Sequence, residues 1–343
     1  MWVDEGSLDS RSWHGHQGEV AGLREVGDQE RTFLTMTTPL VSPPLLERLT
    51  TLGDHLNAHI LGQDECLNDI ALLLRRTLFG LRFPDRPVAS MLFLGPTGTG
   101  KTETVNLFTE HLFGSAEKLV RLDMSEFMTI DSINVLRGSN TSDAGLLGFY
   151  VKRSGNSGTL LFDEIEKADP RIMDVFLQIL SAGRFTLATG ETLDLRGYIV
   201  VATSNIGSRM LIESRSTDRE TIERRALQAG TTEMRPEIFR RFNRAYVFNK
   251  LGFLILKQIG QLHCVKAVDI INAQGHHIDI DPSVVDFIQR EGYSEKYGAA
   301  PMQEAAMRII GDVVASEMLR SGGLPVTGVI HHDRRSNKCS LEK

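Results

Sequence analysis

The stretch Gly95-Pro96-Thr97-Gly98-Thr99-Gly100-Lys101-Thr102 decides the fold of this chain, because it matches the phosphate-binding loop pattern G-x-x-x-x-G-K-[ST] in full. Residues 88–94 before it (VASMLFL) form an apolar run of strand length, and residues 101–113 after it carry apolar side chains at helical spacing. A strand, a glycine turn and a helix in this order direct backbone N–H groups and the positive end of a helix dipole at an anion. The stretch therefore predicts that Lys101 reaches the phosphates of a nucleoside triphosphate and that Thr102 ligates Mg²⁺.

An apolar run that ends in two acids follows at Leu160-Leu161-Phe162-Asp163-Glu164. Residues 159–162 have the composition of a buried strand, so we expect Asp163 at the end of the strand, beside the Mg²⁺ and its waters. Glu164 is then placed to polarise an attacking water as a general base. The alternative is a solvated acidic turn, and the apolar residues before the acids and the helix-like sequence after them argue against it.

A third apolar run, residues 198–202, ends in Thr203-Ser204-Asn205. An amide just past a third strand would be able to position water beside the terminal phosphate, which makes Asn205 a candidate for the site. Strands that end in this way usually lead into a turn, so the motif by itself leaves the role of Asn205 open.

The order of apolar strands and helical segments predicts the fold class. Over residues 44–250 they alternate, which predicts an α/β domain with a parallel sheet and helices on both faces. The site of such a sheet lies at the carboxyl ends of its strands. We expect a small, mainly helical lid over residues 251–333 and a loose polar tail over 334–343. The composition of residues 1–43 predicts a disordered segment, and we expect Met36 to be the true start of the protein.

Composition argues against several classes of function. The chain has 343 residues, of which 41% are hydrophobic and 24% charged, as in a globular protein. Its formal net charge of −6 argues against a nucleic-acid binder with a broad basic surface. The cysteines Cys66, Cys264 and Cys339 form no C-x-x-C pattern, so neither a zinc site nor a disulfide framework is indicated. No signal peptide and no membrane-spanning run are evident, and we expect a cytoplasmic protein that binds neither nucleic acid nor membrane.

Several motifs, in a fixed order, give the chain a resemblance to a known family. They are ILGQDE at 60–65, GPTGTGKT at 95–102, LDMSEF at 122–127, LFDEIEKAD at 161–169, GR at 183–184, TSNIGS at 203–208, RPEIFRR at 235–241 and GY at 292–293. With them the chain resembles an AAA+ ATPase of the Clp type, above all the second ATPase module of the Clp-family disaggregases and unfoldases. The resemblance covers most of the chain, from about Ile60 to about Leu319.

The resemblance implies roles for further residues. Ile60 and Leu61 would line an adenine pocket, and Asn205 would be the first sensor, placing water near the γ-phosphate. Arg241 would be the arginine finger that reaches the site of a neighbouring subunit, with Arg235 and Arg240 as alternatives. Without the resemblance, the basic run that contains these arginines would be read as a solvated or ion-paired face.

The chain departs from the family in its lid. Family members carry a Gly-Ala-Arg-Pro run whose arginine contacts the γ-phosphate within the same subunit, whereas this chain has Gly298-Ala299-Ala300-Pro301. Ala300 therefore stands where the resemblance implies a cation. Coupling between hydrolysis and lid movement is put in doubt by this difference, while nucleotide binding through the phosphate loop need not be lost.

The second departure concerns the loop that grips a threaded polypeptide in related proteins, which carries Gly-Tyr-Val-Gly. The nearest match here is Gly145-Leu146-Leu147-Gly148, followed by Phe149 and Tyr150. Leu146 would take the place of the tyrosine, and a leucine grips with a smaller and less planar surface. We expect Leu146, Leu147, Phe149 and Tyr150 to form a possible substrate loop, and the alternative is an apolar loop packed on its own domain.

Clp members that feed a protease carry an aliphatic-Gly-aromatic docking tripeptide between the first sensor and the arginine finger. The corresponding stretch here, residues 206–233, has no such tripeptide and is rich in charged side chains. We therefore expect no ClpP-type peptidase as a partner.

The function that these patterns favour is a ring-forming, Mg²⁺-dependent ATPase, a homo-hexamer by resemblance, that uses ATP hydrolysis to remodel or unfold protein substrates. An adaptor is a further possible partner. The alternative is an ATP-driven assembly or switch factor that binds a protein partner without threading it, which the altered loop and Ala300 favour. An ATP-binding scaffold without turnover is disfavoured because both acids, Asp163 and Glu164, are present.

Overall fold

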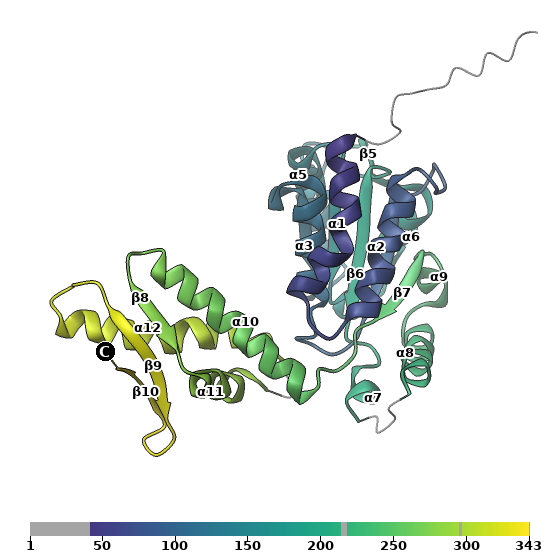
Figure 1. The fold of residues 1–343 in the computed structure, drawn as a ribbon. Coiled ribbons are helices and arrows are strands. Elements are labelled where there is room, and N and C mark those ends of the chain that lie inside the picture. Colours follow the sequence, from purple (N-terminus) through teal and green to yellow (C-terminus); the bar gives the residue numbers. More distant parts are fainter. Residues whose placement is uncertain (1–41, 214–217, 295–296, 343) are drawn as a thin grey trace, which may run out of the picture. The chain divides into compact units, whose positions relative to one another are not determined.

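The computed structural model describes residues 42–213, 218–294 and 297–342. The predicted disordered segment and the expected start at Met36 lie, apart from residues 42–43, outside this part of the chain. The division into domains at residues 250 and 251 stays a prediction. The helices, shown in Figure 1, are α1 Pro43–His59, α2 Asp64–Leu78, α3 Lys101–Phe113, α4 Ser132–Arg137, α5 Gly145–Ser154, α6 Met173–Ala182, α7 Ser208–Glu213, α8 Arg219–Glu233, α9 Pro236–Phe239, α10 Phe253–Asn272, α11 Pro282–Gly292 and α12 Met302–Arg320.

Strands and short 3₁₀ turns complete the described elements. The strands are β1 Ala89–Leu94, β2 Leu119–Asp123, β3 Gly158–Asp163, β4 Arg184–Thr186, β5 Thr192–Asp194, β6 Tyr198–Ser204, β7 Arg244–Val247, β8 His277–Ile280, β9 Thr327–Asp333 and β10 Lys338–Glu342. The 3₁₀ turns are η1 Ala116–Lys118, η2 Met124–Glu126 and η3 Ile165–Lys167.

The central sheet is parallel, as the alternation of strands and helices predicts. Its order is β2-β3-β6-β1-β7, and every pair in it is parallel. The strand that leads into the phosphate loop, β1, therefore lies between β6 and β7, and β3, which leads into the two acids, is on the other side of β6. This order brings the ends of all three predicted strands to one edge of the sheet.

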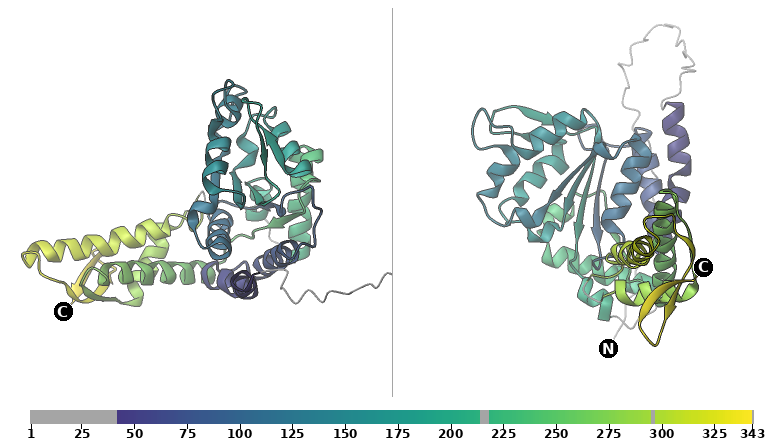
Figure 2. Two further views of the ribbon diagram at one scale, coloured as in Figure 1. Left: turned by 90° about the horizontal axis from the view of Figure 1, so that it is seen from above. Right: turned by 90° about the vertical axis from the view of Figure 1, so that its left-hand side faces the viewer.

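Helices cover both faces of the central sheet (Figure 2), and alternate residues of its strands pack on opposite faces. In β6, Ile199 and Val201 belong to a core shared with α1, α2 and α3, whereas Val200 and Ala202 belong to a core shared with α5 and α6. All four side chains are fully buried. The fold is thus an α/β sheet with helices on both faces, which confirms the predicted fold class.

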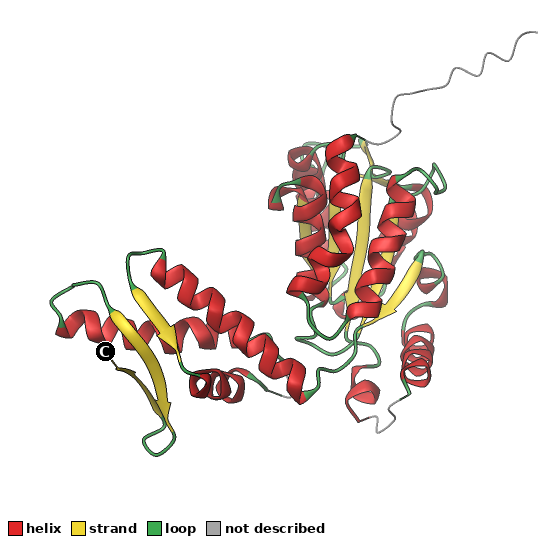
Figure 3. Cartoon of the chain, in the orientation of Figure 1, coloured by secondary structure: helices red, strands yellow, loops and turns green. Residues whose placement is uncertain are grey.

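The C-terminal part is mainly helical, as predicted, but its sheet is larger than the sequence suggested (Figure 3). Helices α10, α11 and α12 share a core with β8 and β9. The expectation of a loose tail over residues 334–343 was wrong, because residues 338–342 form β10, which pairs antiparallel with β9. Cys339 and Leu341 alternate with polar residues and pack on the core of this part, so burial of one strand face orders the segment.

The predicted substrate loop at residues 145–150 is also corrected, because these residues form the first turns of helix α5. Leu147 and Val151 are buried four residues apart on the face that packs on the sheet. Leu146 and Tyr150 are partly buried against the same core, and Phe149 is 58% exposed. The exposed loop instead precedes the helix, where Asp143 accepts hydrogen bonds from the backbone N–H groups of residues 139 and 145.

No helix within the described residues is both long and apolar enough to cross a membrane.

Candidate nucleotide-binding site

A cavity of about 600 Å³ lies at the carboxyl ends of β1, β3 and β6, where the sequence predicts the site. The predicted residues that line it are Ile60, Leu61, Thr97, Gly98, Thr99, Gly100, Lys101, Thr102, Asp163, Glu164 and Asn205. Gly95 and Pro96 are not among the lining side chains and contribute backbone carbonyls to the loop instead. The chain therefore brings together three motifs that are far apart in the sequence.

The phosphate loop has the backbone conformation that its glycines allow. Gly98 and Gly100 have φ of +73° and +99°, a region that other residues rarely adopt. Helix α3 begins directly after Gly100, so its unpaired N–H groups and its positive dipole end face the loop. These features fit the phosphates of a nucleotide.

Lys101 is the cation at the centre of the site. Its side chain is buried, and its ammonium donates to the carbonyls of Gly95 at 2.5 Å and Pro96 at 2.8 Å and to Asn205 Oδ1 at 3.1 Å. Burial lowers the pKa of Lys101 to about 8, and the charges of Glu166, Asp163 and Glu164, in that order, oppose the shift. The carboxylates around it therefore keep this lysine protonated near neutral pH.

Three side chains form hydrogen bonds with the carboxylate of Asp163 at the end of β3. Thr102 Oγ1 lies 3.1 Å and Thr203 Oγ1 2.5 Å from Asp163 Oδ1, while Arg121 Nη2 lies 2.5 Å from Oδ2. A hydroxyl and a carboxylate side by side are hard oxygen donors, and Mg²⁺ typically takes one or two such protein ligands beside phosphates and water. Thr102 and Asp163 therefore fit the metal that the sequence predicts.

Glu164 has an unusual backbone conformation, with φ of +56°. A non-glycine residue in the left-handed region costs free energy and is often found at functional sites. The carboxylate of Glu164 accepts from Asn205 Nδ2 at 3.0 Å and forms an ion pair with Lys167. The hydrogen bond with Glu164 raises the pKa of Lys167, so the lysine stays charged in this contact.

Several apolar side chains line part of the cavity. Ile60 packs against the position of Gly100, where an added Cβ would lie 3.0 Å from Ile60 Cγ2. Ile259 and Leu262, on one face of α10, line the cavity together with Leu61. These side chains suit a flat, apolar group such as a nucleobase.

The C-terminal part reaches the phosphate loop through backbone contacts. The N–H of Ala299 donates to Gly98 O at 3.4 Å, and a Cβ added to Gly98 would lie 2.2 Å from Tyr297 O. Ala300 lines the cavity but carries no polar group. The cationic group that α10 contributes to the lining is Lys266, two turns beyond Ile259.

The arginines of residues 235–244 do not line this cavity. Arg235 pairs with Asp174 at 2.8 Å and Glu237 at 3.0 Å, and Arg244 is also paired. Arg240 and Arg241 are exposed and form no ion pair with another described residue. Arg241 therefore lies apart from the other predicted site residues of its own chain, as do the α5 residues Leu146, Leu147, Phe149 and Tyr150.

Sequence reasoning missed three polar neighbours of the site, Arg121, Thr203 and Glu166. Arg121 and Asp123 lie on one face of β2, and the register pairs Arg121 with Leu161, two residues before Asp163. Arg121 was detectable as a charged residue between apolar residues of a strand, but its partner depends on strand order. Glu166 was detectable only as part of the acidic motif.

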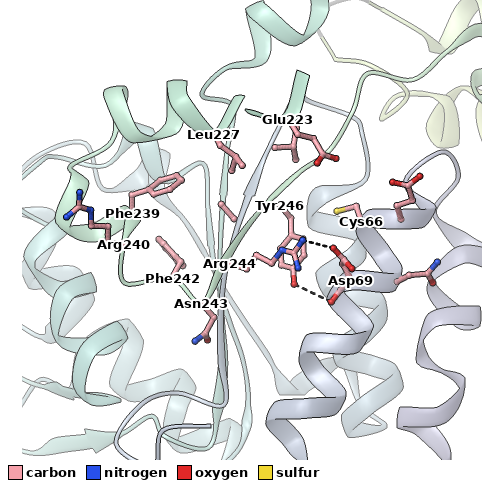
Figure 4. Close-up of a pocket in the computed structure, with 14 residues that line it drawn as sticks. Cys66, Asp69, Glu223, Leu227, Phe239, Arg240, Phe242, Asn243, Arg244 and Tyr246 are labelled. Carbon is pink, nitrogen blue, oxygen red and sulfur yellow. Dashed lines mark hydrogen bonds and ion pairs between the residues drawn. The ribbon is translucent and has the colours of Figure 1, made fainter. Parts of the chain in front are cut away.

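A second, larger cavity of about 720 Å³ lies along β7, between α2 and the α8–α9 region (Figure 4). An ion pair of 2.7 Å between Arg244 and Asp69 crosses it, and the Tyr246 hydroxyl donates to the Asp69 carbonyl at 3.3 Å. Arg240 lines this cavity, whereas the phosphate loop, Asp163 and Glu164 do not. Although this cavity is the larger of the two, it is therefore not the candidate nucleotide-binding site.

Two family models match the chain. The model described as AAA domain (Cdc48 subfamily) matches residues 86–245, which include the phosphate loop and the acids. The model described as the C-terminal, D2-small domain of ClpB protein matches residues 251–330.

Curated relatives agree with these models. The chain is 34% identical over 282 residues to Chaperone protein ClpB 1 of a Nostoc species, covering 80% of this chain and 32% of the relative. It is 36% identical over 313 residues to the ATP-dependent Clp protease ATP-binding subunit ClpC of Staphylococcus aureus, covering 86% of this chain and 38% of the relative. The chain thus spans about a third of the length of these relatives. The chain belongs to the AAA+ ATPases of the Clp type.

Proposed function

We propose that this chain hydrolyses ATP with Mg²⁺ and uses the energy to remodel or unfold protein substrates. The observation that carries the proposal is the convergence of Lys101, Thr102, Asp163, Glu164 and Asn205 at one cavity. These groups come from the ends of three neighbouring strands, and an ion-pair surface without function would not need this arrangement. The relatives' printed names, a chaperone and an ATP-binding subunit of a protease, support the same proposal.

Each group has a role in hydrolysis that its position supports. The loop amides and Lys101 would bind the phosphates, and Thr102 and Asp163 would hold Mg²⁺, which supplies charge neutralisation on the phosphates when bound. Glu164 would take a proton from the attacking water, once its carboxylate turns from Lys167 toward that water. Asn205 would orient the same water, since its side chain lies between Lys101 and Glu164.

A neighbouring subunit would complete the site. Arg241 is exposed and unpaired among the described residues, and it lies outside the cavity of its own chain. We infer that it stabilises developing charge in the site of an adjacent copy, in a ring that the resemblance implies to be a hexamer. Arg240 has the same exposure, whereas Arg235 is engaged by two acids of its own chain and is a weaker candidate.

The alternative function, an assembly or switch factor that binds a protein without threading it, gains support from helix α5. Leu147 is fully buried and Leu146 partly so, and an element packed on its own core offers little to grip a moving chain. We also propose that the chain works without a ClpP-type peptidase, with an adaptor as a further partner, in the cytoplasm.

The test uses Glu164→Gln, which retains the size of the side chain but cannot accept the proton. The variant should bind ATP, lose at least about a hundredfold in turnover and trap the protein on its partner. We would purify it in ATP and Mg²⁺, image the assemblies and identify the proteins that copurify. Extended polypeptide in a central channel supports unfolding, and one defined protein on the rim supports the assembly factor. Unchanged turnover in Glu164→Gln would contradict hydrolysis at this site.

A further inference from the structure

Glu166 lies in the 3₁₀ turn η3, two residues after Glu164, and its carboxylate points back toward the site. Its Oε1 accepts a hydrogen bond of 3.0 Å from the backbone N–H of Asn205. Its Oε2 is buried without a hydrogen-bond partner in the described part of the chain. A buried carboxylate oxygen without a partner is costly unless a nearby charge compensates it.

The anchored residue, Asn205, is the first residue after β6, so its N–H lies beyond the ladder of the sheet. Its side chain nevertheless makes the central contacts of the site. Asn205 Nδ2 donates to Glu164 at 3.0 Å, and Asn205 Oδ1 accepts from Lys101 at 3.1 Å and from Thr97 at 3.3 Å. A displaced Asn205 backbone would therefore disturb Glu164, Lys101 and Thr97 of the phosphate loop together.

Glu166 does not line the cavity, so it acts on the site from behind, through Asn205. Among the carboxylates that oppose the effect of burial on the Lys101 pKa, Glu166 has the largest influence, ahead of Asp163 and Glu164.

We propose that Glu166 is a positioning residue of the nucleotide site, which fixes the side chain of Asn205 by holding the Asn205 backbone N–H. The proposal rests on the function proposed above, because it assumes that Asn205 acts on the attacking water in ATP hydrolysis. Glu166 itself does not line the cavity.

Two substitutions test the anchoring role. Glu166→Gln keeps an acceptor for the Asn205 N–H, whereas Glu166→Ala removes it. The control is Glu117→Ala, which removes an exposed carboxylate that pairs with Arg153 outside the lining of the cavity. Binding of a fluorescent ADP analogue is measured by anisotropy, and turnover is measured at saturating ATP and Mg²⁺.

Glu166→Ala should lower kcat by about tenfold, since Asn205 is no longer fixed. Glu166→Gln should keep kcat within about twofold of the unaltered protein, because its amide oxygen accepts the same hydrogen bond. Glu117→Ala should match the unaltered protein in both assays.

Equal kcat in the alanine and glutamine variants would overturn the anchoring role. Melting temperatures of the variants show whether a change in turnover accompanies loss of fold, and the glutamine variant preserves the buried shape. If the unaltered protein bound no nucleotide, the proposed function itself would fail, which distinguishes the two failures.

Discussion

Nucleotide affinity should fall as the pH rises through about 8, because the cation that we propose to bind the phosphates, Lys101, has a pKa that burial lowers to about 8. Only the charged form of Lys101 would attract phosphate, so affinity should be fully present below this pKa and lost above it. The charged fraction falls from about nine-tenths at pH 7 to about one-tenth at pH 9, which predicts an increase in Kd of about tenfold. A lysine with the usual pKa of about 10.4 would leave Kd nearly constant over this range.

The assay is a titration of the protein into a fluorescent ADP analogue, followed by anisotropy at constant ionic strength. The matched control is Lys101→Arg, since a guanidinium stays charged at all of these pH values. Its affinity is expected to be lower at pH 7 because the buried position fits an ammonium, but its pH profile should be flat.

Two results would refute the reasoning. The first is a Kd of the unaltered protein that changes less than about twofold between pH 7 and pH 9. The second is an equal fall in Lys101→Arg, which would assign the pH dependence to another group. Either result would mean that the loop carbonyls and carboxylates stabilise the charged lysine more strongly than its burial disfavours it.

Two further predictions concern stability. Gly98→Ala should weaken nucleotide binding and lower the melting temperature more than Gly190→Ala. Both glycines have positive φ, but only a Cβ at position 98 would meet backbone, 2.2 Å from Tyr297 O. Equal effects of the two substitutions in thermal unfolding and in the anisotropy titration would contradict a contact between the phosphate loop and the lid. Tyr198→Phe should lower the free energy of unfolding, measured in urea, by about 1–3 kcal/mol. The reason is that the buried Tyr198 hydroxyl forms hydrogen bonds with Ser154 Oγ at 2.8 Å and Val151 O at 3.2 Å. A loss below about 0.5 kcal/mol would show that water replaces these hydrogen bonds.

Local spacing along the chain was enough to predict the fold class and most of the motifs that the structure brings to one cavity. The phosphate loop, the acids of β3 and Asn205 each follow an apolar strand, and a parallel sheet must bring such strand ends to one edge. Residues 277–280 and 282–292 were likewise predictable from alternation and helical spacing, and they form β8 and α11.

Two segments show how a local pattern can mislead. Residues 145–148 match a Gly-x-x-Gly loop, but the burial of Leu147 and Val151 one turn apart makes them part of α5. Residues 338–342 look polar, but alternate side chains cover the core of the lid, so they form β10. In both segments packing against a distant surface overrides the local composition.

The sequence by itself determined which chemical groups this protein brings to a nucleotide, because a phosphate loop and a pair of acids require fixed residues at fixed spacing. Only the tertiary structure decided which groups surround them. Arg121 meets Asp163 because β2 and β3 are neighbours in a particular register, and Glu166 meets Asn205 because β3 and β6 are neighbours in another. Such contacts depend on the order and register of strands that are some forty residues apart in the chain, and no local pattern encodes them.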